Sequence, residues 1–168
     1  MPVTRAFFGK KSAVRLLGLA GFLVLGACAA RDPGGYGLLA YDCADRAALA
    51  DQDWETAQTV QLSVRHGEYT PMVVGLQRGQ AYVLQIKNGD DYNRRFHAPD
   101  FFRAVALKGV RVAGGAEDTT ACIAGLGLPA GGVVEARFVP VRDGRFRFED
   151  SGLLTALTGD GFGVIRID

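Results

Sequence analysis

Short segments in which apolar and polar residues alternate recur along most of this chain, and they constrain its fold more than any other feature. Apolar residues occupy every second position in Val60–Val64, Tyr82–Ile86, Val134–Phe138 and Phe146–Phe148. A period of two places those side chains on one face of an extended strand. Turn signals rich in Gly, Pro, Asn and Asp separate the segments. Strands of this length joined by such turns predict an all-β fold, an antiparallel β-sandwich.

Two segments with other patterns are predicted to lie outside the strands. Cys43–Trp54 is richer in Ala, Leu and charged residues, so we expect a short helix that packs Leu49 and Trp54 against the domain. Thr119–Leu128 lacks a clean period and is predicted to be a loop with a helical turn around Cys122.

The aromatic pair Phe101 and Phe102 is predicted to fill the core. The stretches Phe101–Leu107 and Val110–Val112 favour an extended conformation. Adjacent residues of a strand point to opposite faces, so we expect Phe101 and Phe102 to fill different layers.

The first 27 residues are typical of a secretory signal peptide. Basic residues at 5, 10, 11 and 15 precede an uncharged apolar run, Leu16–Ala27, that is too short to cross a bilayer comfortably. The following Leu25-Gly26-Ala27-Cys28 resembles a bacterial lipobox, which predicts lipidation of Cys28. Ordinary cleavage nearby, with Cys28 incidental, is the alternative. Ala29 after the cysteine favours the outer membrane over the inner membrane in Gram-negative envelopes.

The part of the chain after the signal peptide is predicted to hold one domain. Four of the 19 basic residues and none of the 18 acidic ones precede Cys28, so residues 28–168 carry a formal charge of about −3. Nothing in this balance indicates a surface for nucleic acid. Residues 28–41 are rich in glycine and predict a flexible tether, leaving residues 42–168 for the domain.

Cys43 and Cys122 are predicted to form a disulfide. They are the two cysteines that remain once Cys28 is set aside, and oxidising compartments favour pairing. The bridge would close a loop of about 80 residues and stabilise the fold by roughly 4–5 kcal/mol. The alternative is that one of them is a thiolate metal ligand.

Four stretches in order carry a family resemblance: VVGLQRGQAYVLQIKN, APDFF, LPAGGVVEARFVP and GRFRF followed by GFGVIRI. Together they resemble the cupredoxins, the blue-copper family of plastocyanin and azurin, where APEFF often follows HxF. The resemblance covers roughly residues 59–168 and implies a cupredoxin-like Greek-key sandwich with one or two short helices.

The resemblance also implies where type 1 copper ligands would stand, and each position holds another residue. Such a site uses two imidazoles, a thiolate and a weak axial ligand. The first histidine falls on Arg94, the cysteine falls within Glu149–Ser151, and the loop Gly152–Gly161 holds neither His nor Met. We therefore expect no metal and no cofactor at this site.

The two histidines leave an alternative open. His97 follows Arg94 by three residues, so it leaves an extended strand on the opposite face and is predicted to be a rim residue. Copper bound through His66, His97, Cys122 or Met72 is the rival interpretation, although their spacing does not bring them together.

The charges at the copper-ligand positions suggest a hypothesis. Arg94 could form an ion pair with Glu149 or Asp150 and close a vestigial metal pocket whose rim includes His97. The alternative is that these are solvated loop charges that contribute little to stability.

The functional expectation is a non-catalytic protein of the cell envelope. The sequence contains no HExxH motif, no paired CxxC and no recognisable nucleophile with its base, so we expect no enzyme. We expect a periplasmic, lipid-anchored binding or assembly module, with the membrane and an unidentified envelope protein as partners. The alternatives are a copper-binding or electron-transfer cupredoxin with non-standard ligands, and a structural spacer.

Overall fold

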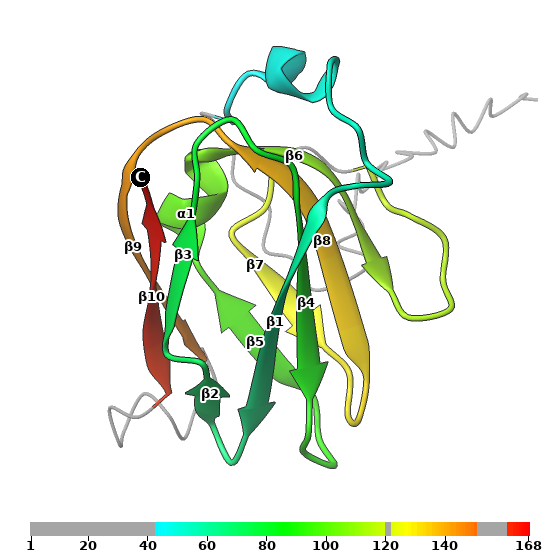
Figure 1. The fold of residues 1–168 in the computed structure, drawn as a ribbon. Helices are drawn as coiled ribbons and strands as arrows, with labels where there is room; N and C mark the ends of the chain where they lie inside the picture. Colours follow the sequence, from blue (N-terminus) through cyan, green and yellow to red (C-terminus); the bar gives the residue numbers. More distant parts are fainter. Residues whose placement is uncertain (1–42, 120–121, 151–160) are drawn as a thin grey trace, which may run out of the picture. The chain divides into compact units, whose positions relative to one another are not determined.

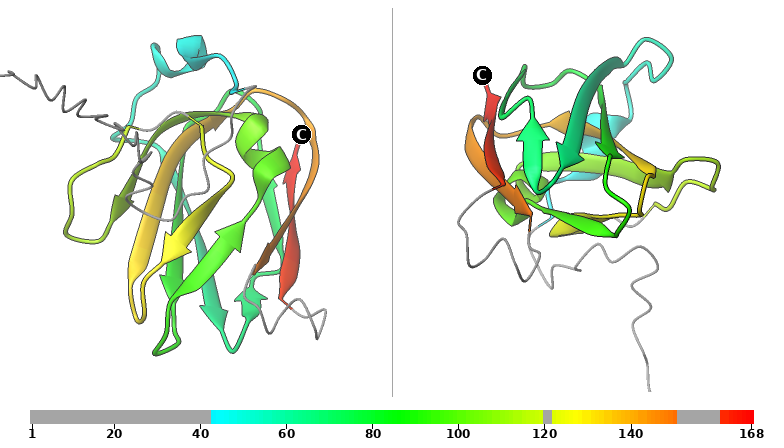
Figure 2. Two further views of the ribbon diagram at one scale, coloured as in Figure 1. Left: turned by 180° about the vertical axis from the view of Figure 1, so that it is seen from behind. Right: turned by 90° about the horizontal axis from the view of Figure 1, so that it is seen from below.

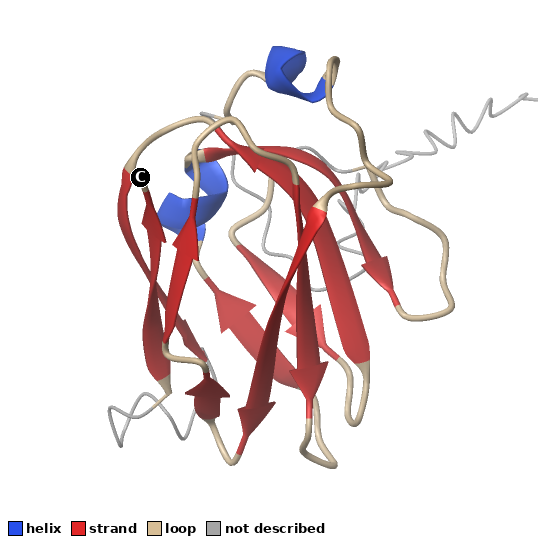
Figure 3. Cartoon of the chain, viewed as in Figure 1, coloured by secondary structure: helices blue, strands red, loops and turns tan. Residues whose placement is uncertain are grey.

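Two five-stranded β-sheets packed face to face form the described part of the protein (Figure 1, Figure 3). The computed structural model describes residues 43–119, 122–150 and 161–168. The predicted signal peptide, Cys28 and the tether lie outside the described residues. Within those three ranges, no helix is long and apolar enough to cross a membrane. The predicted β-sandwich is confirmed.

The strand order of each sheet follows from the hydrogen-bonded ladders. The first sheet has the order β2-β1-β4-β8-β6 and contains β1 (Gln58–Arg65), β2 (Glu68–Thr70), β4 (Tyr82–Asn88), β6 (Val105–Val112) and β8 (Val133–Pro140). The second sheet has the order β3-β10-β9-β5-β7 and contains β3 (Val73–Leu76), β5 (Arg94–His97), β7 (Gly125–Leu128), β9 (Gly144–Asp150) and β10 (Phe162–Ile167).

Two strand pairs run parallel, which the prediction of an antiparallel sandwich did not include. β1 pairs in parallel with β4, and β3 pairs in parallel with β10, whereas the other ladders are antiparallel. The chain leaves the first sheet after β2, adds β3 to the second sheet and returns as β4. That excursion lets β4 enter beside β1 in the same direction, as long connections permit and tight hairpins do not.

The alternating apolar residues face one shared core. Leu62 and Val64 of β1 are 2% and 0% exposed, while their polar neighbours on the strand are exposed. Rings from both sheets meet in the middle, with centroids 5.2 Å apart for Tyr69 and Phe148 and 5.0 Å apart for Phe96 and Phe148. Aromatic contacts of this kind add to the stabilisation from apolar burial.

A short helix replaces the first part of the predicted extended stretch Phe101–Leu107. Helix α1 (Pro99–Arg103) buries both Phe101 and Phe102. Their predicted role in the core is confirmed, but the prediction that they lie in a strand is wrong. Proline is favoured in the first turn of a helix, and Asp100 pairs with Arg103 one turn later at 2.7 Å. These local preferences outweighed the β propensity of the aromatic residues.

The predicted loop Thr119–Leu128 contains strand β7, so the prediction was wrong over its last four residues. Leu126 and Leu128 are buried, but two glycines hide the alternation. A Cβ atom on Gly125 would lie 2.3 Å from the carbonyl oxygen of Phe96, so close pairing of β7 with β5 requires glycine there.

The N-terminal part of the domain is attached by the predicted disulfide between Cys43 and Cys122, whose Cα atoms lie 5.5 Å apart. The short helix expected in Cys43–Trp54 is a single 3-10 turn, η1 (Arg46–Leu49), capped by the side chain of Asp45. Trp54 contributes through its ring, over which the Lys108 ammonium lies at 4.6 Å.

Helix α1 lies at the end of the sandwich opposite the β1–β2 and β4–β5 turns (Figure 1, Figure 2). β5 runs between these two ends and carries Arg94 at its first position. Arg94 therefore stands at the end of the sandwich formed by the two turns.

Candidate functional site

A buried cluster of three charged side chains, Asp90, Arg94 and Asp150, lies at this end of the sandwich. The Arg94 Nη1 atom donates to Asp150 Oδ2 at 2.5 Å, and its Nε donates to Asp90 Oδ2 at 2.8 Å. The side chains are 7%, 3% and 0% exposed for Arg94, Asp90 and Asp150. We call these three residues the charge cluster.

Strand pairing positions the two partners that come from the second sheet. In the ladder between β5 and β9, Phe96 stands opposite Asp150. Arg94 lies two residues before Phe96, on the same inward face of β5, and its long side chain reaches Asp150. Alternation along two strands thus turns both charges toward the interior.

The turn after β4 positions Asp90. Its carboxylate accepts the backbone N–H of His66 at 2.9 and 3.0 Å, and its own backbone N–H donates to Asn88. Asn88 is fully buried and its side-chain nitrogen lies within hydrogen-bonding distance of the backbone oxygens of Tyr92, Leu128 and Pro129. The asparagine therefore fixes the turn that holds the acid.

The pKa shifts of Asp90 and Arg94 both favour the charged forms of these two groups. Burial by itself would raise the pKa of Asp90, but the His66 N–H and the Arg94 guanidinium outweigh it and lower that pKa. Burial would lower the pKa of Arg94, yet its bonds to Asp150 and Asp90 raise it. The Arg94 guanidinium and the Asp90 carboxylate therefore stabilise each other in their charged forms.

Two tyrosines border the charge cluster. Arg94 Nη2 donates to the Tyr92 hydroxyl, and the guanidinium carbon lies 4.4 Å from the centroid of the Tyr92 ring. Tyr69 is 2% exposed, and its hydroxyl has no hydrogen-bond partner in the part of the chain that the structure describes. Burial, followed by the negative charge of Asp150, raises the pKa of Tyr69, so this hydroxyl stays protonated.

The structure separates the other predicted rim residues from the charge cluster. Glu149 lies on the opposite face of β9 from Asp150 and pairs with Arg147 at 3.5 Å, so it is not the partner of Arg94. His97 is half-buried and stands opposite Glu149 in the ladder. His66 is 80% exposed at the β1–β2 turn, where its Nδ1 atom lies 3.8 Å from Asp90.

The donor atoms of the described residues do not fit a type 1 copper site. Such a site needs a thiolate and two imidazoles. Cys43 and Cys122 are bonded to each other, and a guanidinium cannot coordinate copper. Across residues 43–119, 122–150 and 161–168, no group of three or more His, Cys, Asp or Glu is placed to hold a metal ion.

Sequence reasoning named Arg94 and Asp150 but missed Asp90, Asn88, Tyr69 and Tyr92. Asp90 precedes Arg94 by four residues, a spacing that indicates a pair on a helix but carries no such meaning across a turn. The useful signal was the stretch Asn88–Asp91, because Asn and Asp side chains bind nearby backbone groups in turns.

Comparison with solved structures supports the fold. The structure is similar to a laccase from Pediococcus acidilactici, with a TM-score of 0.54 and 14% identity over 68% of this chain and 27% of that one. A multicopper oxidase variant, McoA 2F4, from Aquifex aeolicus gives a TM-score of 0.52 at 10% identity, covering 69% of this chain and 30% of that one. The chain thus spans less than a third of either oxidase. Auracyanin from Roseiflexus castenholzii gives a TM-score of 0.46 at 17% identity, covering 67% of this chain and 98% of that one.

No family model matches the chain. No curated protein matches it either. At these identities the structural likeness to the laccase and to the multicopper oxidase variant establishes the fold alone, and that fold is a cupredoxin-like β-sandwich.

Proposed function

We propose that this protein is a lipid-anchored periplasmic module whose cupredoxin-like domain has lost its type 1 copper site and serves binding or assembly in the cell envelope. The observation that carries the proposal is the charge cluster. Arg94 occupies the position at which the family resemblance expects the first histidine, and Asp150 lies in the segment where it expects the cysteine.

The chemistry of the remaining residues supports the loss of copper. Residues 151–160 contain no His, Cys or Met, and both cysteines of the domain form the disulfide. Cys28 is then the one remaining thiol, and in this proposal it carries the lipid. Arg94 places a positive charge between the buried carboxylates of Asp90 and Asp150, and a guanidinium cannot act as a copper ligand.

A binding role without catalysis is the simplest use of such a domain. Scaffolds of packed β-sheets commonly present binding residues on their loops. The sequence contains no HExxH motif and no paired CxxC, so the proposal includes no reaction. In this proposal the N-terminal lipid attaches the domain to the membrane.

A visible spectrum tests the loss of the copper site. Mature protein, residues 28–168 with Cys28 replaced by Ser, is mixed with Cu(II) and its absorption is recorded. We expect no intense thiolate-to-copper band, and mass spectrometry should find Cys43 and Cys122 two hydrogens short of the reduced form. A strong band that disappears in Cys122→Ser would favour the rival function, a copper-binding or electron-transfer protein that uses non-standard ligands.

Metabolic labelling tests the anchor separately. A bacterium expressing the full chain is grown with a radiolabelled fatty acid. We expect label on the wild-type protein and none on Cys28→Ser. Equal labelling of both would contradict lipidation at Cys28.

A further inference from the structure

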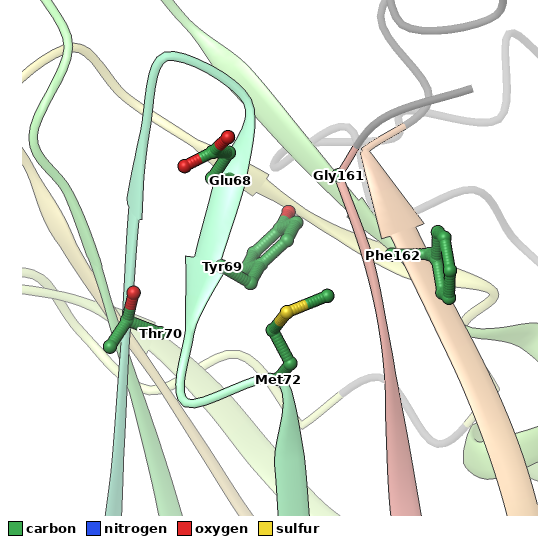
Figure 4. A pocket seen from close by; sticks show the side chains of 6 residues that line it. All are labelled: Glu68, Tyr69, Thr70, Met72, Gly161 and Phe162. Atoms are coloured by element: carbon green, nitrogen blue, oxygen red, sulfur yellow. The ribbon is translucent and has the colours of Figure 1, made fainter.

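Three exposed apolar side chains gather where β3 and β10 begin. Met72, Val73 and Phe162 are 54%, 60% and 41% exposed, and Val73 stands beside Val164 in the parallel ladder. Met72 and Phe162 also line a pocket of about 320 Å³, together with Glu68, Tyr69, Thr70 and Gly161 (Figure 4). Clustered apolar exposure next to a hollow is typical of a docking surface.

The strand beside this pocket has an unpaired edge. In the described sheet, β3 pairs with β10 and has no neighbour on its other side. The backbone oxygens of Met72 and Leu76 accept bonds from Val164 and Asp168, so the intervening Val73 and Gly75 direct their backbone groups away from β10. A Cβ atom built on Gly75 would meet nothing within 4 Å, so the outer face of β3 is open at this position.

Arginines border the apolar residues on the outer face of the second sheet. Arg145 and Arg166 stand directly opposite each other in the ladder between β9 and β10, an arrangement of like charges that destabilises a sheet. Arg166 lies 3.4 Å from Asp168, whereas Arg145 forms no ion pair within the described ranges.

The middle of this face also holds a cation. Arg147 stands opposite Val164, and its guanidinium carbon lies 4.5 Å from the centroid of the Phe162 ring. The acidic groups nearby are Glu149, which pairs with Arg147, Asp168, which lies 3.4 Å from Arg166, and Glu68 at the pocket rim, opposite Arg65 in the β1–β2 ladder. Each of these carboxylates has a basic neighbour, so among the described residues Arg145 is left as the cation of this face that an anionic group of a partner would meet.

We propose that the edge of β3, the pocket and Arg145 bind an extended acidic segment of a partner protein. One apolar side chain of that segment enters the pocket between Met72 and Phe162, its backbone pairs with β3, and a carboxylate of the segment meets Arg145. This inference rests on the proposed binding role and names its face and the chemistry of its partner. A hollow pocket and an open strand edge suit a peptide better than a flat bilayer surface.

Peptide display tests this face. The mature domain is used to select from a library of random peptides, and the affinities of the enriched peptides are measured by fluorescence anisotropy. We expect enriched peptides to carry Asp or Glu around an apolar residue, and Phe162→Asp and Arg145→Glu each to weaken their binding about tenfold or more. Lys87→Glu, the same charge change at an exposed position of β4 in the other sheet, should leave binding within about twofold.

Three results would overturn the assignment: no enrichment, enrichment of basic peptides, or binding that the two variants leave intact. Arg145 is exposed, so Arg145→Glu keeps the test valid even if Phe162→Asp unfolds, which circular dichroism detects. Binding to phosphatidylglycerol vesicles that is lost in the same variants, without peptide binding, would assign the face to the bilayer instead. Peptides that bind the variants as tightly as the wild type would contradict the assignment of this face but not the proposed function. The proposed function is contradicted instead if the Cu(II) spectrum shows the thiolate-to-copper band.

Discussion

Two arginine–carboxylate pairs that share strand β9 differ sharply in their surroundings. Asp150 is 0% exposed and lies 2.5 Å from Arg94, whereas its neighbour Glu149 is 45% exposed and lies 3.5 Å from Arg147. Alternation along one strand turns the first carboxylate inward and the second outward. Adjacent residues with the same charge therefore have different roles.

The comparison teaches that burial, more than the number of pairs, decides what an ion pair contributes. A surface pair is screened by water and contributes little to stability. In a buried cluster, removing one partner leaves an unpaired charge away from water, which is costly even where the intact pair adds little. The charge cluster should therefore respond to mutation far more strongly than Arg147 and Glu149.

The largest expected effect is that of Arg94→Met, which leaves Asp90 and Asp150 buried without their cation. We expect the free energy of unfolding in urea at pH 7 to fall by about 3–5 kcal/mol. Arg147→Met is the matched control, because its charge lies on the exposed face of the same sheet. Equal losses in the two variants would remove the distinction between buried and exposed pairs.

The next effect concerns Asp90 and pH. The pKa of Asp90 is lowered in the folded protein, so its stabilisation is present above the unfolded pKa of about 4 and is lost as pH falls through the folded value. Asp90→Asn should lower the free energy of unfolding by about 2 kcal/mol at pH 7 and flatten its decline in acid. Urea unfolding between pH 7 and pH 3 measures the loss of stability at pH 7 and the decline of stability in acid. A free energy of unfolding that declined in acid as steeply for Asp90→Asn as for the wild type would contradict this role.

A smaller effect of opposite sign is expected at Tyr69. Its buried hydroxyl has no partner among the described residues, so removing it relieves an unsatisfied polar group. Tyr69→Phe should keep the ring contacts and raise the free energy of unfolding by about 1 kcal/mol. Thermal unfolding measures the change, and a loss of stability would indicate that the hydroxyl is satisfied.

The smallest effect is expected at Glu149. Its carboxylate is 45% exposed and its partner Arg147 is 63% exposed, so solvent screens the pair. Glu149→Gln should change the free energy of unfolding by less than about 1 kcal/mol, and added salt should shrink even that difference. A loss of unfolding free energy comparable to that in Arg94→Met would contradict the distinction between buried and exposed ion pairs.

Sequence patterns predicted the strands that alternate cleanly and failed where local chemistry competes with them. The alternation in Val60–Val64 and Phe146–Phe148 predicted β1 and β9, because one buried face leaves a period of two. The pattern failed at α1, where Pro99 favours a helix start, and at β7, where Gly125 makes close strand contact and removes the apolar signal.

The sequence predicted only part of the charge cluster. The family resemblance aligned Arg94 with a ligand position, which made a pair with Glu149 or Asp150 a natural hypothesis. Choosing Asp150 requires the register of β9, because a shift by one residue exchanges the inner and outer faces. Asp90 was not predicted, because it reaches Arg94 through a turn fixed by Asn88 rather than along a strand.

The most direct test of the central claim, that a salt-bridged cluster stands where copper would bind, is urea unfolding of the mature Cys28→Ser domain with Cu(II) and with a chelator. A native copper site of any ligand set would raise the free energy of unfolding by about 2.7 kcal/mol at a free copper concentration of 100 times the dissociation constant. We predict no stabilisation by Cu(II) at any concentration that keeps the protein in solution. A rise that grows with copper concentration would contradict the account.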